Sequence, residues 1–169
     1  MNLTEQLLAE LNREVPRSRR VLEQVPDGKY EWKPHDRSMI FGYLADMVAT
    51  IPSWIAMIVT RDDLDVAPAE GPTMKPEPKT TSGALIAALD QTADAARKAL
   101  QGTTDDHLRT TWKLKARGQV VQEEARYIMI RDTLTHWAHH RGQMTVYLRL
   151  LGAKVPSVYG PSADDTSFR

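Results

Sequence analysis

Apolar residues recur every three or four positions in long stretches of this chain, which is the spacing of amphipathic helices. The first stretch begins at Asn2, which forms the sequence of a capping box with Glu5, and it continues to about Gln24. Pro16 lies inside this stretch, and we expect a bend there because proline lacks the amide proton of a helical hydrogen bond. A turn-forming segment over residues 26–37 should end the helix.

A second apolar stripe predicts a helix from Ser38 to Thr60 that is kinked at Pro52. Residues 61–82 have almost no periodicity and contain Pro68, Pro72, Pro76 and Pro78. We therefore expect a long extended connection there. A connection of this length can cross the molecule, so the helix after it could run parallel to the helix before it.

Two more helices are predicted in the second half of the chain. One covers Gly83–Leu100 and is closed by Gly102, and the other runs from about Glu124 to Leu151 and ends at Gly152. Four long helices with a long crossover between the second and third predict an all-α four-helix bundle in a single domain, residues 1–169.

Two segments fall outside the helical pattern. Residues 109–114 and 119–121 flank the turn-forming residues 116–118, which predicts a short β-hairpin between the third and fourth helices. The tail from Pro156 to Arg169 has no helical spacing, so it is either draped over the helices or mobile.

Charge and composition narrow the classes of function. The 22 basic and 22 acidic residues give a formal net charge of zero, which argues against nucleic acid as a partner. The absence of cysteine excludes a disulfide framework, a thiolate zinc site and a cysteine nucleophile. The sequence shows neither a signal peptide nor an apolar run long enough for a membrane span, so we expect a soluble, cytoplasmic protein without membrane partners.

The segment 135–143 contains three of the five histidines. His136 and His140 are four residues apart and share one helix face, about 6 Å apart along the axis, which is a spacing typical of divalent metal ligands. Histidines that make structural hydrogen bonds in a core have the same spacing, so the pattern leaves both interpretations open. His139 lies about 60° to one side of the pair. Asp132 lies too far from His140 to share a metal, but it could hold the outer nitrogen of His136.

Three segments resemble the DinB/YfiT-like family: residues 25–35, residues 39–54 and residues 134–164 with their Tyr-Gly-Pro-Ser tail. The resemblance implies a four-helix bundle with parallel middle helices, often a homodimer. It also implies a divalent metal held by three histidines, one from the second helix and two, four residues apart, from the fourth.

His136 and His140 match the paired ligands of that family, whereas Met47 stands at the position of the helix-two histidine. A neutral thioether is a poor ligand for Zn or Ni, so the expected site of His136, His140 and Met47 would bind such a metal weakly. Met47 also lies on the apolar stripe of its own helix, where a flexible core residue is the ordinary explanation. Asp46 is rotated by about 100° from Met47 and is a poor replacement. His35 and His107 have no spacing that connects them to the site.

Two functions follow from these expectations. The first is a metal-dependent thiol transferase or isomerase, because the resemblance implies a metal that lowers the pKa of a small thiol substrate or of water. The second is a metal-free, non-catalytic helical dimer, or a protein that binds a small ligand between the second and fourth helices.

Overall fold

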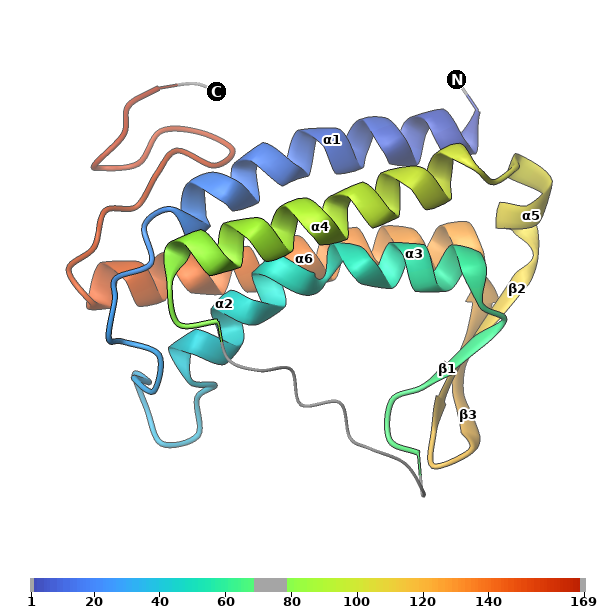
Figure 1. Cartoon of the computed structure of the whole chain (residues 1–169), viewed down its shortest axis with the longest axis horizontal. Coiled ribbons are helices and arrows are strands. Elements are labelled where there is room, and N and C mark those ends of the chain that lie inside the picture. The colour runs from blue at the N-terminus through green and yellow to red at the C-terminus, as the bar shows by residue number, and fades with distance from the viewer. Residues whose placement is uncertain (1, 69–78, 168–169) are drawn as a thin grey trace.

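The computed structural model describes residues 2–68 and 79–167, and these residues form six helices and one small sheet (Figure 1). The elements in chain order are α1 (Leu3–Leu22), α2 (Phe41–Thr50), α3 (Pro52–Thr60), β1 (Asp63–Asp65), α4 (Ser82–Gln101), α5 (Asp105–Arg109), β2 (Thr111–Ala116), β3 (Gln119–Ala125) and α6 (Arg126–Leu150). The predicted predominance of helix is confirmed. The exact four-helix-bundle topology stays a prediction.

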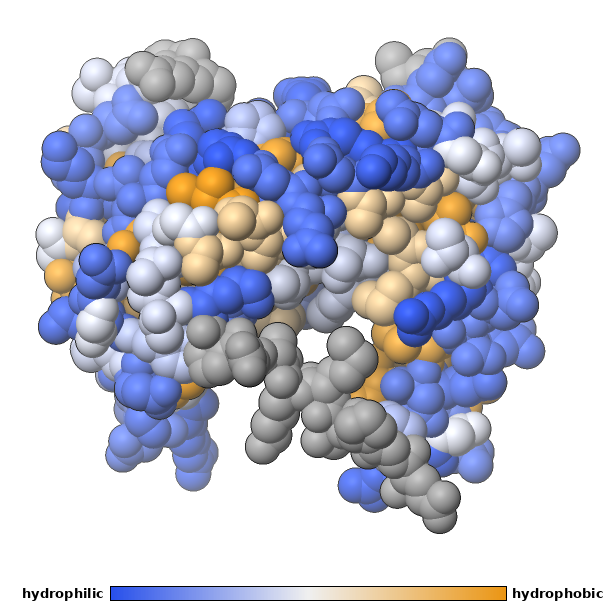
Figure 2. Space-filling view, viewed as in Figure 1, coloured by the Kyte–Doolittle hydropathy of each residue, from blue (hydrophilic) through white to orange (hydrophobic). Residues whose placement is uncertain are grey.

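The long helices share one apolar core. Each of them contributes side chains that are almost fully buried, among them Leu11, Phe41, Ile55, Leu89 and Trp137. In Figure 1 the sheet projects from one end of the helices, while the C-terminal tail lies at the other end. The space-filling view shows a face that is largely hydrophilic, with hydrophobic residues in scattered patches (Figure 2).

The predicted capping box at the start of α1 is confirmed. The Asn2 side-chain oxygen accepts a hydrogen bond from the Glu5 amide at 2.8 Å, and the Glu5 carboxylate accepts one from the Asn2 amide at 3.1 Å. Asp105 in α5 accepts two more, from the amides of Leu3 and Thr4. The free amides in the first turn of α1 are therefore capped by the Asn2 side chain and by Asp105 from a distant segment. The helix continues through Pro16, and the bend predicted there stays a prediction.

The kink predicted at Pro52 is confirmed, because α2 and α3 meet there at 47°. Proline has no amide proton, so the carbonyl of Val48 loses its helical partner. The indole nitrogen of Trp137 donates to that carbonyl at 2.7 Å, and the Thr92 hydroxyl donates to the next carbonyl, that of Ala49, at 2.8 Å. Side chains of α6 and α4 thus satisfy backbone groups at the break.

Helix α2 begins at Phe41, three residues later than the predicted start at Ser38. The Phe41 amide donates to the Trp32 carbonyl at 2.7 Å, and the Gly42 amide donates to the Tyr30 carbonyl at 2.8 Å. The preceding turn therefore takes the place of a side-chain N-cap. The Tyr30 ring lies so close to Gly42 that a Cβ atom at this position would overlap it.

The predicted β-hairpin is confirmed as the antiparallel pair β2–β3. Arg117 and Gly118 at its turn both have positive φ, 52° and 75°, as a two-residue hairpin turn of this kind requires. A third strand, β1, pairs in parallel with β2. This strand lies within residues 61–82, where the sequence predicted an extended connection and no strand. The fold is mostly helical, with a three-stranded sheet in place of the predicted hairpin alone. Residues 69–78, with Pro72, Pro76 and Pro78, lie outside the described residues.

Arg126 connects the sheet to the helices through hydrogen bonds and an ion pair. Its side chain is only 3 % exposed, and it donates to the carbonyls of Ile58 and Arg61 at the end of α3. It also donates to the Thr110 hydroxyl at 3.0 Å and pairs with Asp62 at 2.8 Å. One buried guanidinium therefore joins α3, α6 and the strands.

The tail after α6 lies against the helices. Ser157 is fully buried, and its carbonyl accepts a hydrogen bond from Arg20 Nε at 3.1 Å. Of the two alternatives for this segment, the described residues 156–167 show the draped one. Within the described residues, no single helix is long and apolar enough to span a membrane. The bent pair α2 and α3 meets the length and hydropathy criteria only when the two helices are counted together.

Candidate metal centre

His136 and His140 converge on each other, as their four-residue spacing on α6 allows. Their Nε2 atoms lie 3.0 Å apart, and the ring planes are nearly perpendicular, at 89°. Two nitrogens that each bind one metal at about 2.0–2.1 Å would be about 2.9–3.4 Å apart for bond angles of about 90–110°. The observed separation therefore fits a hydrogen bond, and it also fits two ligands of one divalent metal.

His140 is the more buried member of the pair, with 6 % of its surface exposed. Its Nδ1 lies 2.9 Å from Oε1 of Gln143. An amide oxygen only accepts hydrogen bonds, so this contact requires a proton on Nδ1, and in the neutral ring the lone pair is then on Nε2, which faces His136. A hydrogen bond from the outer nitrogen is the usual support of a metal-ligating histidine.

His136 is half-buried and stacks on Trp54 of α3, with ring centroids 5.4 Å apart and planes 25° apart. Burial lowers the pKa of His136 below the usual 6.5, and the neighbouring His140 and His139 lower it further. His136 is therefore mostly neutral at pH 7, which is the form that binds metals.

Met47 is half-buried and packs against the core from α2. None of the hydrogen bonds or ring contacts recorded for the two histidines involves it. Across residues 2–68 and 79–167, no group of three or more His, Asp or Glu side chains is arranged to hold a metal. The described residues thus supply two convergent imidazoles, and Met47 as third ligand stays a prediction.

The other three histidines are not part of the convergent pair, and only His139 lies near it. His139 is exposed, with its ring centroid 5.3 Å from that of His140. His35 accepts a hydrogen bond from the Arg37 amide within an exposed turn, whereas His107 lies in α5 with Nε2 2.9 Å from the Val59 carbonyl. Asp132 is exposed, and the described structure records no hydrogen bond from it to His136.

Asp46 is buried beside the candidate third ligand but has a different partner. Its side chain is 3 % exposed, and Lys79 Nζ lies 3.6 Å from Oδ1, which makes no hydrogen bond among the described residues. Burial raises the pKa of Asp46, although the charge of Lys79 opposes that rise. The structure therefore pairs Asp46 with Lys79.

A buried charge network surrounds Arg141 of α6, and its partners Glu14 and Tyr159 were not predicted from the sequence. Arg141, directly after His140, is 1 % exposed and donates to the Glu14 carboxylate, to the Ser18 hydroxyl at 2.9 Å and to the Tyr159 hydroxyl. One signal was present in the sequence, because Glu14 interrupts the apolar face of α1 three residues after Leu11.

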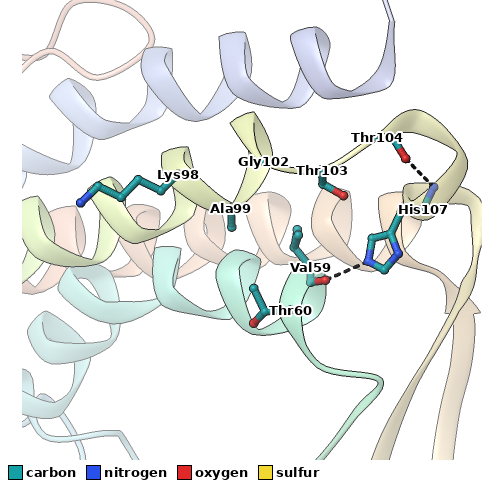
Figure 3. A pocket seen from close by; sticks show the side chains of 8 residues that line it. All are labelled: Val59, Thr60, Lys98, Ala99, Gly102, Thr103, Thr104 and His107. Atoms are coloured by element: carbon teal, nitrogen blue, oxygen red, sulfur yellow. Dashed lines mark hydrogen bonds between the residues drawn. The ribbon is translucent and has the colours of Figure 1, made fainter.

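A cavity of about 510 Å³ lies elsewhere, where α3, α4 and α5 meet (Figure 3). Its lining includes neither histidine of the pair nor Met47, and consists of Val59, Thr60, Lys98, Ala99, Gly102, Thr103, Thr104 and His107. His107 turns its ring to the Val59 carbonyl, so its Nε2 atom is already engaged. This cavity adds no ligand to the candidate metal centre.

Comparison with known proteins gives consistent similarities. A sequence model of the DinB family matches residues 1–167. Uncharacterized protein YrdA of Bacillus subtilis (strain 168) is 33 % identical over 114 residues, which cover 66 % of this chain and 62 % of YrdA. The chain thus matches less than two thirds of that relative's length.

Two solved structures are similar over most of the chain. A DinB-like protein from Bacillus cereus ATCC 10987 has a TM-score of 0.70 at 24 % identity, covering 92 % of this chain and 97 % of its own. The DinB-like protein YjoA from Bacillus subtilis has a TM-score of 0.66 at 15 % identity, covering 88 % and 93 %. At these identities the likeness shows a shared fold.

Proposed function

Because the chain belongs to the DinB family through residues 1–167, we propose that it binds a divalent metal, Ni or Zn, at His136 and His140. The observation that carries this proposal is the 3.0 Å separation of the two Nε2 atoms. The Gln143 contact, which directs the His140 lone pair toward His136, supports it.

The proposed site is incomplete as a protein site. Two imidazoles alone hold a metal weakly, and a Met47 thioether adds little for Ni or Zn. We therefore expect low metal affinity, with several coordination positions left for water or for a small thiol substrate. A metal held there would lower the pKa of such a thiol or water, which is the chemistry of a metal-dependent transferase or isomerase.

A metal-free function is the second candidate. It is favoured by the hydrogen bond that the two imidazoles can make with each other and by the lack of a third His, Asp or Glu ligand in the described part of the chain. In that case the histidine pair has a structural role only, and the region between α2 and α6 binds either a small molecule or nothing.

Metal analysis separates the two candidates. We expect protein purified without a histidine tag to bind about one Ni or Zn per chain in a calorimetric titration, and His136→Ala to abolish that binding. His35→Ala is the matched control, because His35 lies in an exposed turn. Binding that is absent from the unaltered protein, or equally retained by His136→Ala, would favour the metal-free function.

A further inference from the structure

His136 has fewer fixed contacts than its partner in the candidate metal centre. Its one recorded hydrogen-bond contact is the 3.0 Å approach of its Nε2 to that of His140. His140 is held on its other side by Gln143, whereas Nδ1 of His136 has no hydrogen-bond partner in the described part of the chain. A half-buried imidazole can turn about its side-chain bonds. A different kind of contact must therefore fix the orientation of this ring.

The indole of Trp54 makes that contact. Its ring centroid lies 5.4 Å from that of His136, and the two planes are 25° apart, which is the geometry of a stacked aromatic pair. The ring contacts recorded for His140 are with His136 and His139. Trp54 thus stacks on one member of the pair, the one that lacks a support on its outer nitrogen.

The break between α2 and α3 places Trp54 beside α6. Pro52 begins α3 at the 47° bend, and Trp54 follows it in the first turn of that helix. Trp137, which comes directly after His136, donates to the Val48 carbonyl just before the same break. The indole and the imidazole therefore belong to two backbone segments that a buried hydrogen bond connects.

We infer that Trp54 is a positioning residue of the candidate metal centre: its indole face holds the His136 ring in the orientation that turns Nε2 toward His140. Without the stack, the His136 side chain gains other rotamers, in which Nε2 leaves the 3.0 Å contact. The change is confined to one side chain, so the backbone of α6 need not move. For metal binding this inference rests on the proposed function, whereas for the contact between the imidazoles it does not.

The test removes the stacked ring with Trp54→Leu and restores an aromatic ring with Trp54→Phe. Trp32→Leu is the matched control, because Trp32 is also half-buried and is in ring contact with Tyr147 of α6 at 5.7 Å. The first readout is the ¹⁵Nε2 signal of His140 in metal-free protein, which senses its contact with His136. The second readout is the Ni²⁺ affinity in a calorimetric titration.

We expect Trp54→Leu to shift the His140 signal and to weaken Ni²⁺ binding about fivefold, the worth of one stacked aromatic pair. Trp54→Phe should recover most of both, and Trp32→Leu should change neither. If Trp54→Leu lowers thermal stability but leaves the His140 signal as in Trp32→Leu, the stack is only structural and the inference is wrong. Equal losses in Trp54→Phe and Trp54→Leu would also contradict it, because the role requires an aromatic ring.

A measurement on the unaltered protein complements the variants. Ni²⁺ bound to His136 should quench the emission of the stacked indole, so quenching should be larger in the unaltered protein than in Trp54→Phe. Equal quenching would overturn the inference even if Trp54→Leu did not fold. If the unaltered protein binds no Ni²⁺, the proposed function fails, and the His140 signal alone decides the positioning role.

Discussion

At the scale of the residue, the two central histidines differ through their neighbours. His140 is held by Gln143, and His136 by the Trp54 ring. The sequence predicted the pair, because four-residue spacing on a helix brings side chains together wherever the helix packs. It could not predict Trp54, which lies on another helix and reaches His136 only through tertiary packing.

The first prediction concerns Met47, which stands where the resemblance to the family implies a metal-binding histidine. We expect Met47→His to tighten Ni or Zn binding by about 100-fold or more, because a third imidazole replaces a weak donor. Calorimetric titration measures the change. Met47→Leu should leave affinity unchanged, and an equal affinity for Met47→His would show that position 47 does not face the imidazoles.

The second prediction uses the acidity of Glu14. Burial by itself would raise its pKa, but Arg141, Tyr159 and Arg17 together hold the pKa below the usual 4.5. The ionised carboxylate therefore stabilises the fold above about pH 4.5, and this contribution is lost as the pH falls through the lowered pKa.

Glu14→Gln should accordingly reduce the free energy of unfolding by about 3 kcal/mol at pH 7, since it leaves the Arg141 charge buried and uncompensated. Urea unfolding at a series of pH values measures the difference from the unaltered protein. The difference should shrink below pH 4.5, and one that stayed constant down to pH 2 would contradict the lowered pKa.

At the scale of the element, the break between α2 and α3 shows what sequence can and cannot reveal. Pro52 predicted the kink because its ring and missing amide proton are local properties. The donors that satisfy the freed carbonyls, Trp137 and Thr92, come from distant helices and have no local signal. Likewise the turn of the hairpin was predictable, whereas β1 is three residues long and pairs with a strand about fifty residues away.

The third prediction belongs to this break. Pro52→Ala supplies an amide proton that competes with Trp137 for the Val48 carbonyl. We expect faster hydrogen exchange of the Trp137 indole proton and a loss of about 1 kcal/mol in stability, despite the better helix propensity of alanine. Pro16→Ala is the control and should stabilise the protein, because Pro16 is exposed and no side chain donates to the Asn12 carbonyl in the described structure. Stabilisation by both variants would contradict the role assigned to Trp137.

At the scale of the whole molecule, the ends of the described chain are held by polar contacts with distant segments. Asp105 caps the start of α1, and Glu14 with Arg141 holds the tail at Tyr159. Hydrophobic periodicity predicted the helices well but carries no information on such pairs, because each joins residues far apart in sequence.

The fourth prediction is the association of two chains, which the resemblance implies. We expect sedimentation equilibrium to give twice the 19.1 kDa of one chain at micromolar concentration. The mass of a single chain over the whole concentration range would contradict it.

The close approach of Tyr30 to Gly42 has a consequence for sequence variation in this branch of proteins. Because no side chain fits at position 42 while an aromatic ring covers it, an alanine or serine at 42 should occur only together with a small residue at 30. An alignment of close relatives would therefore show these two positions changing as a pair. Where they change, we expect the backbone turn before α2 to differ as well.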